Sequence, residues 1–314
     1  MKILFAGTPE MAVPALMRLN KTNNIVGVLT PPDKPSGRKR KPTPSPVKQA
    51  AMDLGLTVLQ PNTLRTEARK EIAELQPDLL AVVAYGKIFG EKFLSLFSQG
   101  AINLHPSLLP RYRGPSPIPA AILAGDSKTG ITIQRIGLEM DAGDILMQEE
   151  IPLTGKETTG SLEEYCGNMG AEMIGEVADL FAQGNPPKPI SQNHSNASFC
   201  NLINKQDGLI DWNKDAVRLE REVRAYYPWP QSYTYFRGKK LAVLSADVYD
   251  AQETLSEVKQ GTVIGIDKKQ GILIQTGKGV LLTDRLQLQS KKPLYWKNFL
   301  NGVQDFVGET LQGA

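Results

Sequence analysis

Short apolar segments alternate with helix-like segments over the first 184 residues, and this alternation restricts the fold more than any other feature of the sequence. The apolar segments lie at residues 2–7, 24–30, 57–61, 79–86 and 101–107. Residues 9–20 and 65–75 carry the apolar spacing of amphipathic helices. Strands that alternate with helices predict an α/β domain with a parallel sheet, in which ligands bind beyond the carboxyl ends of the strands.

The next segments extend this pattern. Residues 130–136 and 143–151 have the pattern of a hairpin that continues the sheet. Residues from Thr158 to Gln183 have the pattern of one long helix. We therefore predict a Rossmann-like parallel sheet domain over residues 1–184.

The rest of the chain has a different pattern. Residues 184–198 are rich in Pro, Asn and Ser, and we predict a linker over residues 185–204. After a helical segment at 216–228, helical signal nearly disappears. Short apolar runs separated by turns follow at 232–236, 240–249, 261–267, 271–277 and 279–288. This spacing predicts a small antiparallel β-barrel, OB-like, over residues 205–314.

Composition limits the kind of protein further. The 314 residues include two cysteines, Cys166 and Cys200, and two histidines, His105 and His194. They supply neither a disulfide framework nor zinc-ligand spacing, so we expect reduced thiols and no metal. The sequence has no signal-peptide pattern and no run of 18 apolar residues. We expect a cytoplasmic monomer without a membrane span.

Residues 33–48 form a basic, proline-rich segment. Its prolines prevent a helix through most of its length, and so long a loop inside a compact domain is more often functional than not. The segment contains six positively charged residues and a single negative one, Asp33. It has no aromatic residue for base stacking. The six are Lys34, Arg38, Lys39, Arg40, Lys41 and Lys48. The segment is either a solvated surface loop or a contact for a phosphate backbone.

The stretch AINLHPSLLPRYRGPSP, residues 101–117, contains the strongest candidate for chemistry. Asn103 and His105 are two residues apart at the end of a predicted strand, so their side chains lie on one face. An amide and an imidazole placed together at the edge of a sheet can both address one reacting oxygen. A carboxylate partner is available between Gly137 and Gly143 or just beyond. The candidates are Glu139, Asp141 and Asp144.

Asn103, His105 and Asp141 together resemble the active site of the folate-dependent formyltransferases. HPSLLPRYRGPSP, MDAGDI and the spacing of 36 residues between His105 and Asp141 (141 − 105) fit that family's pattern. The resemblance is specific to the branch that formylates methionyl-tRNA, because five separated motifs occur in order. They are FAGTPE, PPDKPSGRKRKPTPSPVK, VVAYGKI, DGLIDW and YYPWPQSYT, within residues 4–234.

The resemblance implies an activity and roles for individual residues. A formyl group would move from 10-formyltetrahydrofolate to the α-amine of initiator methionyl-tRNA, without a metal. Asn103 and His105 would stabilise charge on the formyl oxygen, and Asp141 would favour the charged imidazole and assist proton transfer. Implied folate contacts are Tyr85, Gly86, Ser107, Leu108, Leu109, Pro110 and Met140. Implied tRNA contacts are Arg38, Lys39, Arg40 and Lys41, with the C-terminal barrel adding backbone contacts.

Three alternatives remain open at this stage. Leu108 and Leu109 could be ordinary core residues. A formyltransferase for a small amine would share Asn103, His105 and Asp141 but would need neither the basic loop nor a tail domain. A nucleotide-binding or RNA-binding module without chemistry is a third possibility. The turn AGTPE lacks the glycines of a dinucleotide-binding motif, which counts against nucleotide binding.

Overall fold

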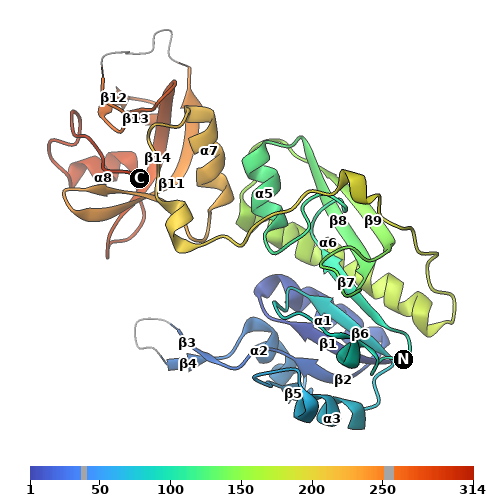
Figure 1. Ribbon diagram of the computed structural model, residues 1–314. Helices are drawn as coiled ribbons and strands as arrows, with labels where there is room; N and C mark the ends of the chain where they lie inside the picture. The colour runs from blue at the N-terminus through green and yellow to red at the C-terminus, as the bar shows by residue number, and fades with distance from the viewer. Residues whose placement is uncertain (37–40, 251–257) are drawn as a thin grey trace. The chain divides into compact units, whose positions relative to one another are not determined.

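A seven-stranded sheet forms the centre of the N-terminal part of the computed structural model (Figure 1). The strand order is β5-β2-β1-β6-β7-β8-β9; the first five strands are parallel, and β8 and β9 form antiparallel pairs. The bounds are β1 Lys2–Gly7, β2 Asn24–Leu29, β5 Val58–Leu59, β6 Leu79–Val83, β7 Ala101–His105, β8 Lys128–Arg135 and β9 Ile145–Pro152. The predicted Rossmann-like sheet and the hairpin that extends it are confirmed.

The structure describes residues 1–36, 41–250 and 258–314, and the chain forms two compact units. The first unit comprises Met1–Pro117, Lys128–Pro152 and Leu162–Asn201. The second unit comprises Ile118–Ser127, Leu153–Ser161 and Leu202–Ala314. Most of the segment predicted as a linker therefore lies with the first unit, where it reaches the candidate site described below.

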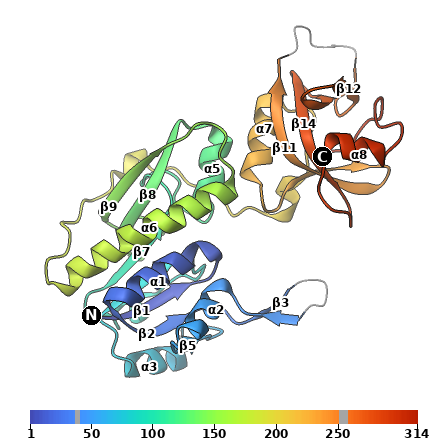
Figure 2. The same ribbon diagram turned by 180° about the vertical axis from the view of Figure 1, so that it is seen from behind.

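Helices cover both faces of the sheet, with α1 and α6 along one of them (Figure 2). The helices of the first unit are α1 Val13–Thr22, α2 Pro46–Asp53, α3 Thr66–Glu74, α4 Glu91–Leu94 and most of α6 Thr159–Ala182, with 3-10 turns η1 Glu10–Ala12 and η2 His194–Asn196. Nearly all of α5 Pro117–Ala124 lies with the second unit. The predicted long helix is α6. No helix within the described ranges is both long and apolar enough to cross a membrane.

Side-chain alternation along the strands decides which face the candidate residues occupy. Leu4, Leu80 and Val82 pack in one core cluster with Ile72 of α3 and Phe93 of α4. This cluster therefore lies on the face of the sheet that α3 and α4 cover.

Strand β7 turns its candidate residues toward that same face. Leu104 points to α6, because a Cβ on Gly170 of α6 would lie 2.4 Å from Leu104 Cδ1. Asn103 and His105 alternate with Leu104, so they point away from α6. The register supports this orientation, since it pairs Asn103 with Val82 of the α3–α4 cluster.

Asp179 of α6 makes polar contacts with α1 and the residue that follows it. Its carboxylate accepts hydrogen bonds from Arg18 Nη2 (2.8 Å), Thr22 Oγ1 (2.7 Å) and Asn23 Nδ2 (3.0 Å). Burial alone would raise the pKa of Asp179, but these donors outweigh it and the net pKa is lowered. The ionised carboxylate thus stabilises the folded state.

We expect Asp179→Asn to lower the free energy of unfolding at pH 7 by about 1–2 kcal/mol, a range reduced for the partial exposure of the pair. The contribution is present above the unfolded pKa of about 3.9 and is lost as pH falls through the lower folded pKa. Urea unfolding at pH 7 and pH 3 should show the difference shrinking in acid. Glu176→Gln, an exposed change on the same helix, is the control, and an equal loss for both variants would contradict the prediction.

The basic segment contains more regular structure than we predicted. β3 Lys34–Ser36 and β4 Lys41–Thr43 pair as a two-stranded antiparallel ribbon. Helix α2 begins within the segment, at Pro46, because a proline in the first helical turn needs no N–H partner. Ser45 Oγ accepts the Lys48 N–H at 3.1 Å and caps this helix. The predicted tRNA contacts Arg38, Lys39 and Arg40 lie outside the described residues.

The second unit is built on an antiparallel sheet of order β10-β11-β14-β13-β12, with β15 paired to β14. Its elements are β10 Ser232–Phe236, β11 Lys239–Tyr249, β12 Val263–Asp267, β13 Gly271–Gln275, β14 Val280–Leu288, β15 Leu294–Tyr295, α7 Ala216–Ala225, α8 Trp296–Asn301 and η3 Lys205–Gly208. Leu241, Ile274, Leu281 and Phe306 belong to one core cluster of this unit.

The C-terminal tail connects the two outer strands of this sheet. Gln312 and Tyr235 of β10 exchange backbone hydrogen bonds of 2.9 Å. On the other side, Leu311 N donates to Gly261 O, and Val263 N donates to Glu309 O. The tail therefore lies between β10 and the start of β12, which gives the unit its barrel-like circuit.

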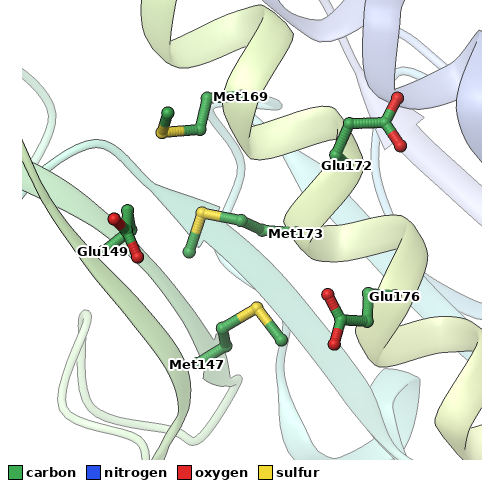
Figure 3. Close-up of a pocket in the computed structure, with 6 residues that line it drawn as sticks. All are labelled: Met147, Glu149, Met169, Glu172, Met173 and Glu176. Carbon is green, nitrogen blue, oxygen red and sulfur yellow. The ribbon is translucent and has the colours of Figure 1, made fainter.

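A hollow of about 410 Å³ lies between β9 and α6 in the first unit. Figure 3 shows the side chains of Met147, Met169 and Met173 pointing into it, with glutamates around them. Because the hollow opens on the α6 side of the sheet, it is not part of the surface that carries Asn103 and His105.

Candidate active site

His105 is the last residue of β7, and its side chain is 6% exposed. Its Nε2 lies 2.9 Å from the carbonyl oxygen of Tyr112. A carbonyl only accepts, so Nε2 carries a proton in this arrangement. The other nitrogen, Nδ1, lies 3.7 Å from Asp141 Oδ1, which is too far for a hydrogen bond. Nδ1 is therefore the nitrogen available to a reacting group.

Asp141 reaches His105 from the segment between β8 and β9. Its Oδ2 accepts the Gly114 N–H at 2.8 Å, and its Oδ1 accepts from Gln134 Nε2 at 2.9 Å. These donors fix both carboxylate oxygens. The φ of Asp141 is +51°, a left-handed conformation that is uncommon for a residue other than glycine.

Asn103 completes the arrangement on the same face. It is partly buried, and the register places it opposite Gln134 of β8 and two residues before His105. Within the residues that the structure describes, no hydrogen-bond partner occupies the Asn103 side chain. Its amide is therefore available to a ligand beside His105 and Asp141.

The structure separates the three carboxylates that the sequence left open. Asp144 accepts a hydrogen bond from Ser191 Oγ at 2.9 Å. Glu139 is 70% exposed and lies 3.6 Å from Arg113 Nη1. Only Asp141, of these three, is placed beside His105.

Three polar residues that we had not predicted support Asp141. Gln134 could have been suspected, since it alternates with the apolar residues of β8 and opposes Asn103. Arg113 and Gln192 could not, because 79 residues separate them and neither belongs to a periodic pattern. Among the described residues, no cluster of three or more His, Cys, Asp or Glu is arranged to hold a metal ion.

Gly143 allows the Asp141 segment to pass close to β8. A Cβ at Gly143 would lie 1.9 Å from the carbonyl oxygen of Arg135, whereas a Cβ at Gly137 would meet no atom of the described residues within 4 Å. We expect Gly143→Ala to lower kcat at least tenfold, because the segment must shift and carries Asp141 with it. Gly137→Ala is the matched control. Steady-state kinetics of both variants is the measurement, and similar activity for both would contradict the prediction.

The predicted folate segment SLLP is partly internal. The Ser107 hydroxyl is buried and donates to Arg111 O at 2.6 Å. Leu109 is 3% exposed, and its N–H donates to Thr132 Oγ1 at 3.2 Å. Leu108 and Pro110 are partly exposed, and the Leu109–Pro110 peptide is cis. The side chains of Ser107 and Leu109 thus hold the segment in place.

The other predicted folate residues lie in two different segments. The Tyr85 side chain is buried beyond the end of β6, and burial raises its pKa to about 12. Its hydroxyl has no partner among the described residues. Gly86 is exposed with a φ of +77°, and Met140, next to Asp141, is 53% exposed. Strand register puts the end of β6 beside β7, since Val83 pairs with Leu104.

Comparison with family models identifies the class of protein. Residues 1–177 match the model described as formyl transferase, and residues 202–304 match the model described as formyl transferase, C-terminal domain. The chain therefore belongs to the formyl transferase family. Within it, the chain belongs with the methionyl-tRNA formyltransferases: that enzyme from Treponema denticola is 45% identical over 317 residues, which cover 98% of each chain.

Solved structures support the fold. Methionyl-tRNA formyltransferase from Clostridium thermocellum has a TM-score of 0.57 and 16% identity, with 80% of this chain and 95% of that chain covered. The N-formyltransferase from Helicobacter canadensis, in complex with folinic acid and dTDP-3-aminofucose, has a TM-score of 0.65 and 18% identity, with 90% and 98% covered. At these identities the likeness concerns the fold alone.

Proposed function

We propose that this enzyme transfers a formyl group from 10-formyltetrahydrofolate to the α-amine of initiator methionyl-tRNA, with Asn103, His105 and Asp141 as the catalytic residues. The observation that carries the proposal is the placement of Asn103 beside the His105–Asp141 pair. This arrangement of three side chains occurs in a chain that matches the methionyl-tRNA formyltransferase of Treponema denticola over 98% of its length.

Two features at the strand ends support a folate site. Gly86 exposes backbone at the end of β6. Met140 offers an exposed apolar side chain next to Asp141. When bound, 10-formyltetrahydrofolate supplies the formyl carbon that the amine attacks. Leu108, Pro110, Tyr85, Gly86 and Met140 would contact it, and Ser107 and Leu109 would hold the segment that does so.

Asn103 and His105 act on the formyl oxygen. As the new N–C bond forms, negative charge develops on this oxygen, and donors placed for that charge lower the barrier. Asn103 donates from its free amide, and His105 donates from Nδ1, because Nε2 is bonded to Tyr112 O. Fixed donors of this kind contribute roughly 3–4 kcal/mol each.

Asp141 acts on the proton. Its carboxylate is held by Gly114 N–H and Gln134, and it faces His105 Nδ1 at 3.7 Å. A negative charge at this position attracts the N–H that His105 directs at the formyl oxygen and helps to orient the ring. The Asp141 carboxylate can accept the proton of the attacking amine and return it to the departing nitrogen. No covalent bond to the enzyme is needed.

Two regions would contact the tRNA. One is the basic segment with Arg38, Lys39, Arg40 and Lys41. The other is an exposed surface of the second unit, where the Arg285 guanidinium lies 5.8 Å from the centre of the Tyr295 ring. Exposed Lys291 and Lys292 lie in the adjacent turn. Cations next to aromatic rings suit a polynucleotide, which offers phosphates and stackable bases.

The direct test is a formyl-transfer assay with purified protein. Tetrahydrofolate release from 10-formyltetrahydrofolate should depend on methionyl-tRNA and should yield N-formylmethionyl-tRNA. Glycinamide ribonucleotide and an amino sugar nucleotide are the control acceptors. Transfer to either small amine, without transfer to methionyl-tRNA, would overturn the proposed substrate.

A further inference from the structure

We infer that Gln192 is a positioning residue, which holds Asp141 beside His105 by joining the Asp141 segment to buried Arg113. The inference rests on the proposed function, because it assumes that Asp141 is catalytic. Gln192 is 5% exposed and lies far from Asp141 in sequence, in the segment that the sequence suggested was only a linker.

The Gln192 amide is saturated with partners of opposite kinds. Its Nε2 donates to the carbonyl oxygens of Asp141 (2.8 Å) and Gly143 (2.7 Å). Its Oε1 accepts from Arg113 Nη2 (2.7 Å) and Nε (3.1 Å). Carbonyls only accept and a guanidinium only donates, so a single amide orientation satisfies all four contacts. Two of them hold the backbone on either side of Ala142.

Arg113 is a rigid anchor for the Gln192 side chain. Its side chain is 1% exposed, and its Nη2 also lies 3.3 Å from His194 Nδ1. Its backbone is hydrogen-bonded to residues 198–200, which follow Gln192 in the chain. Arg113 N donates to Ser198 O, and Cys200 N donates to Arg113 O, each at 2.8 Å. A buried guanidinium with this many bonds cannot move without leaving a charge unpaired, which is costly.

The same stretch of chain also holds the Asp141 side chain. Gly114 follows Arg113, and its N–H donates to Asp141 Oδ2. Residues 113 and 114 therefore hold Asp141 twice: through Gln192 at the backbone and through Gly114 at the carboxylate. This double attachment offsets the unfavourable φ of +51° at Asp141, which a segment without these bonds would relax.

The chemistry of the position requires a neutral amide. A glutamate at 192 would keep the pairing with Arg113, but its oxygens would face the carbonyls of Asp141 and Gly143 without a hydrogen. A methionine would keep the length of the side chain and remove every hydrogen bond. Both changes release the Asp141 segment, and only the second also removes the two hydrogen bonds that Arg113 donates to Gln192.

The test is a pair of kinetic measurements on Gln192→Glu, with Gln192→Met as the second variant if the first folds poorly. We expect kcat to fall about 10- to 100-fold, or roughly 1.4–2.7 kcal/mol. We expect the KM for 10-formyltetrahydrofolate to stay within about twofold. A loss confined to KM, or an unchanged kcat in a folded variant, would overturn the inference.

A double-mutant comparison separates positioning from general destabilisation. If Gln192 acts through Asp141, Gln192→Glu should change kcat less than about threefold in the Asp141→Ala background. An equal factor in both backgrounds would mean that Gln192 has only a structural role. The outcomes stay distinct from failure of the proposed function, in which Asp141→Ala alone would leave kcat unchanged.

Discussion

Replacing His105, Asn103 or Asp141 by alanine should lower kcat for formyl transfer by two to three orders of magnitude without unfolding the protein. The physical reason is the loss of a fixed donor, or of its carboxylate partner, at the point where charge develops on the formyl oxygen. Single-turnover kinetics with saturating methionyl-tRNA is the measurement, because it isolates the chemical step from product release. Circular dichroism and urea unfolding of each variant should report a folded protein.

The matched control is the other aspartate of the same segment. Asp144→Ala removes a carboxylate that bonds Ser191 and does not face His105, so its kcat should stay within about twofold. Activity of His105→Ala within about tenfold of wild type, roughly 1.4 kcal/mol, would refute the catalytic assignment. Equal losses for Asp141→Ala and Asp144→Ala would refute the choice of Asp141.

Much of this fold follows from local patterns in the sequence. The apolar segments before His105 and around residue 80 are continuous and short, as expected of parallel strands covered on both faces, and they became β7 and β6. The alternation that put Asn103 and His105 on one face is a local property too. Helix α2 was missed because proline was given its helix-breaking role, although at Pro46 it occupies the first turn.

The sequence could not show which acidic residue lies beside His105, and the three-dimensional structure was needed to identify it. Glu139, Asp141 and Asp144 are equivalent in sequence, and each sits near a glycine. What separates them is the path of the chain past β8, where Gly143 approaches Arg135 O too closely for a side chain. The bonds from Gln134 and Gly114 then select Asp141. Contacts of this kind join residues that are distant in sequence, so no periodic pattern in the sequence predicts them.

Removing the charges of the basic segment should weaken methionyl-tRNA binding and flatten its dependence on salt. The variant replaces Arg38, Lys39, Arg40 and Lys41 by alanine. For every phosphate that the variant no longer neutralises, the slope of log K against log salt should fall by about 0.7–0.9. Arg38→Ala alone should weaken binding more than Lys39→Ala, because a guanidinium grips phosphate through two parallel hydrogen bonds. Folate binding should be unchanged, since its proposed contacts lie at the strand ends.

A second fourfold variant makes the result specific to this segment. Arg65, Arg69, Lys70 and Lys92 lie on or beside α3 and α4, so their replacement by alanine removes the same charge from another surface. A salt titration of tRNA binding, measured for wild type and both variants, compares local contact with net charge. If the two variants shift the slope equally, only the overall field of the protein matters. If neither shifts it, the phosphate contacts belong to the second unit, and the surface around Arg285 and Lys291 becomes the next place to remove charge.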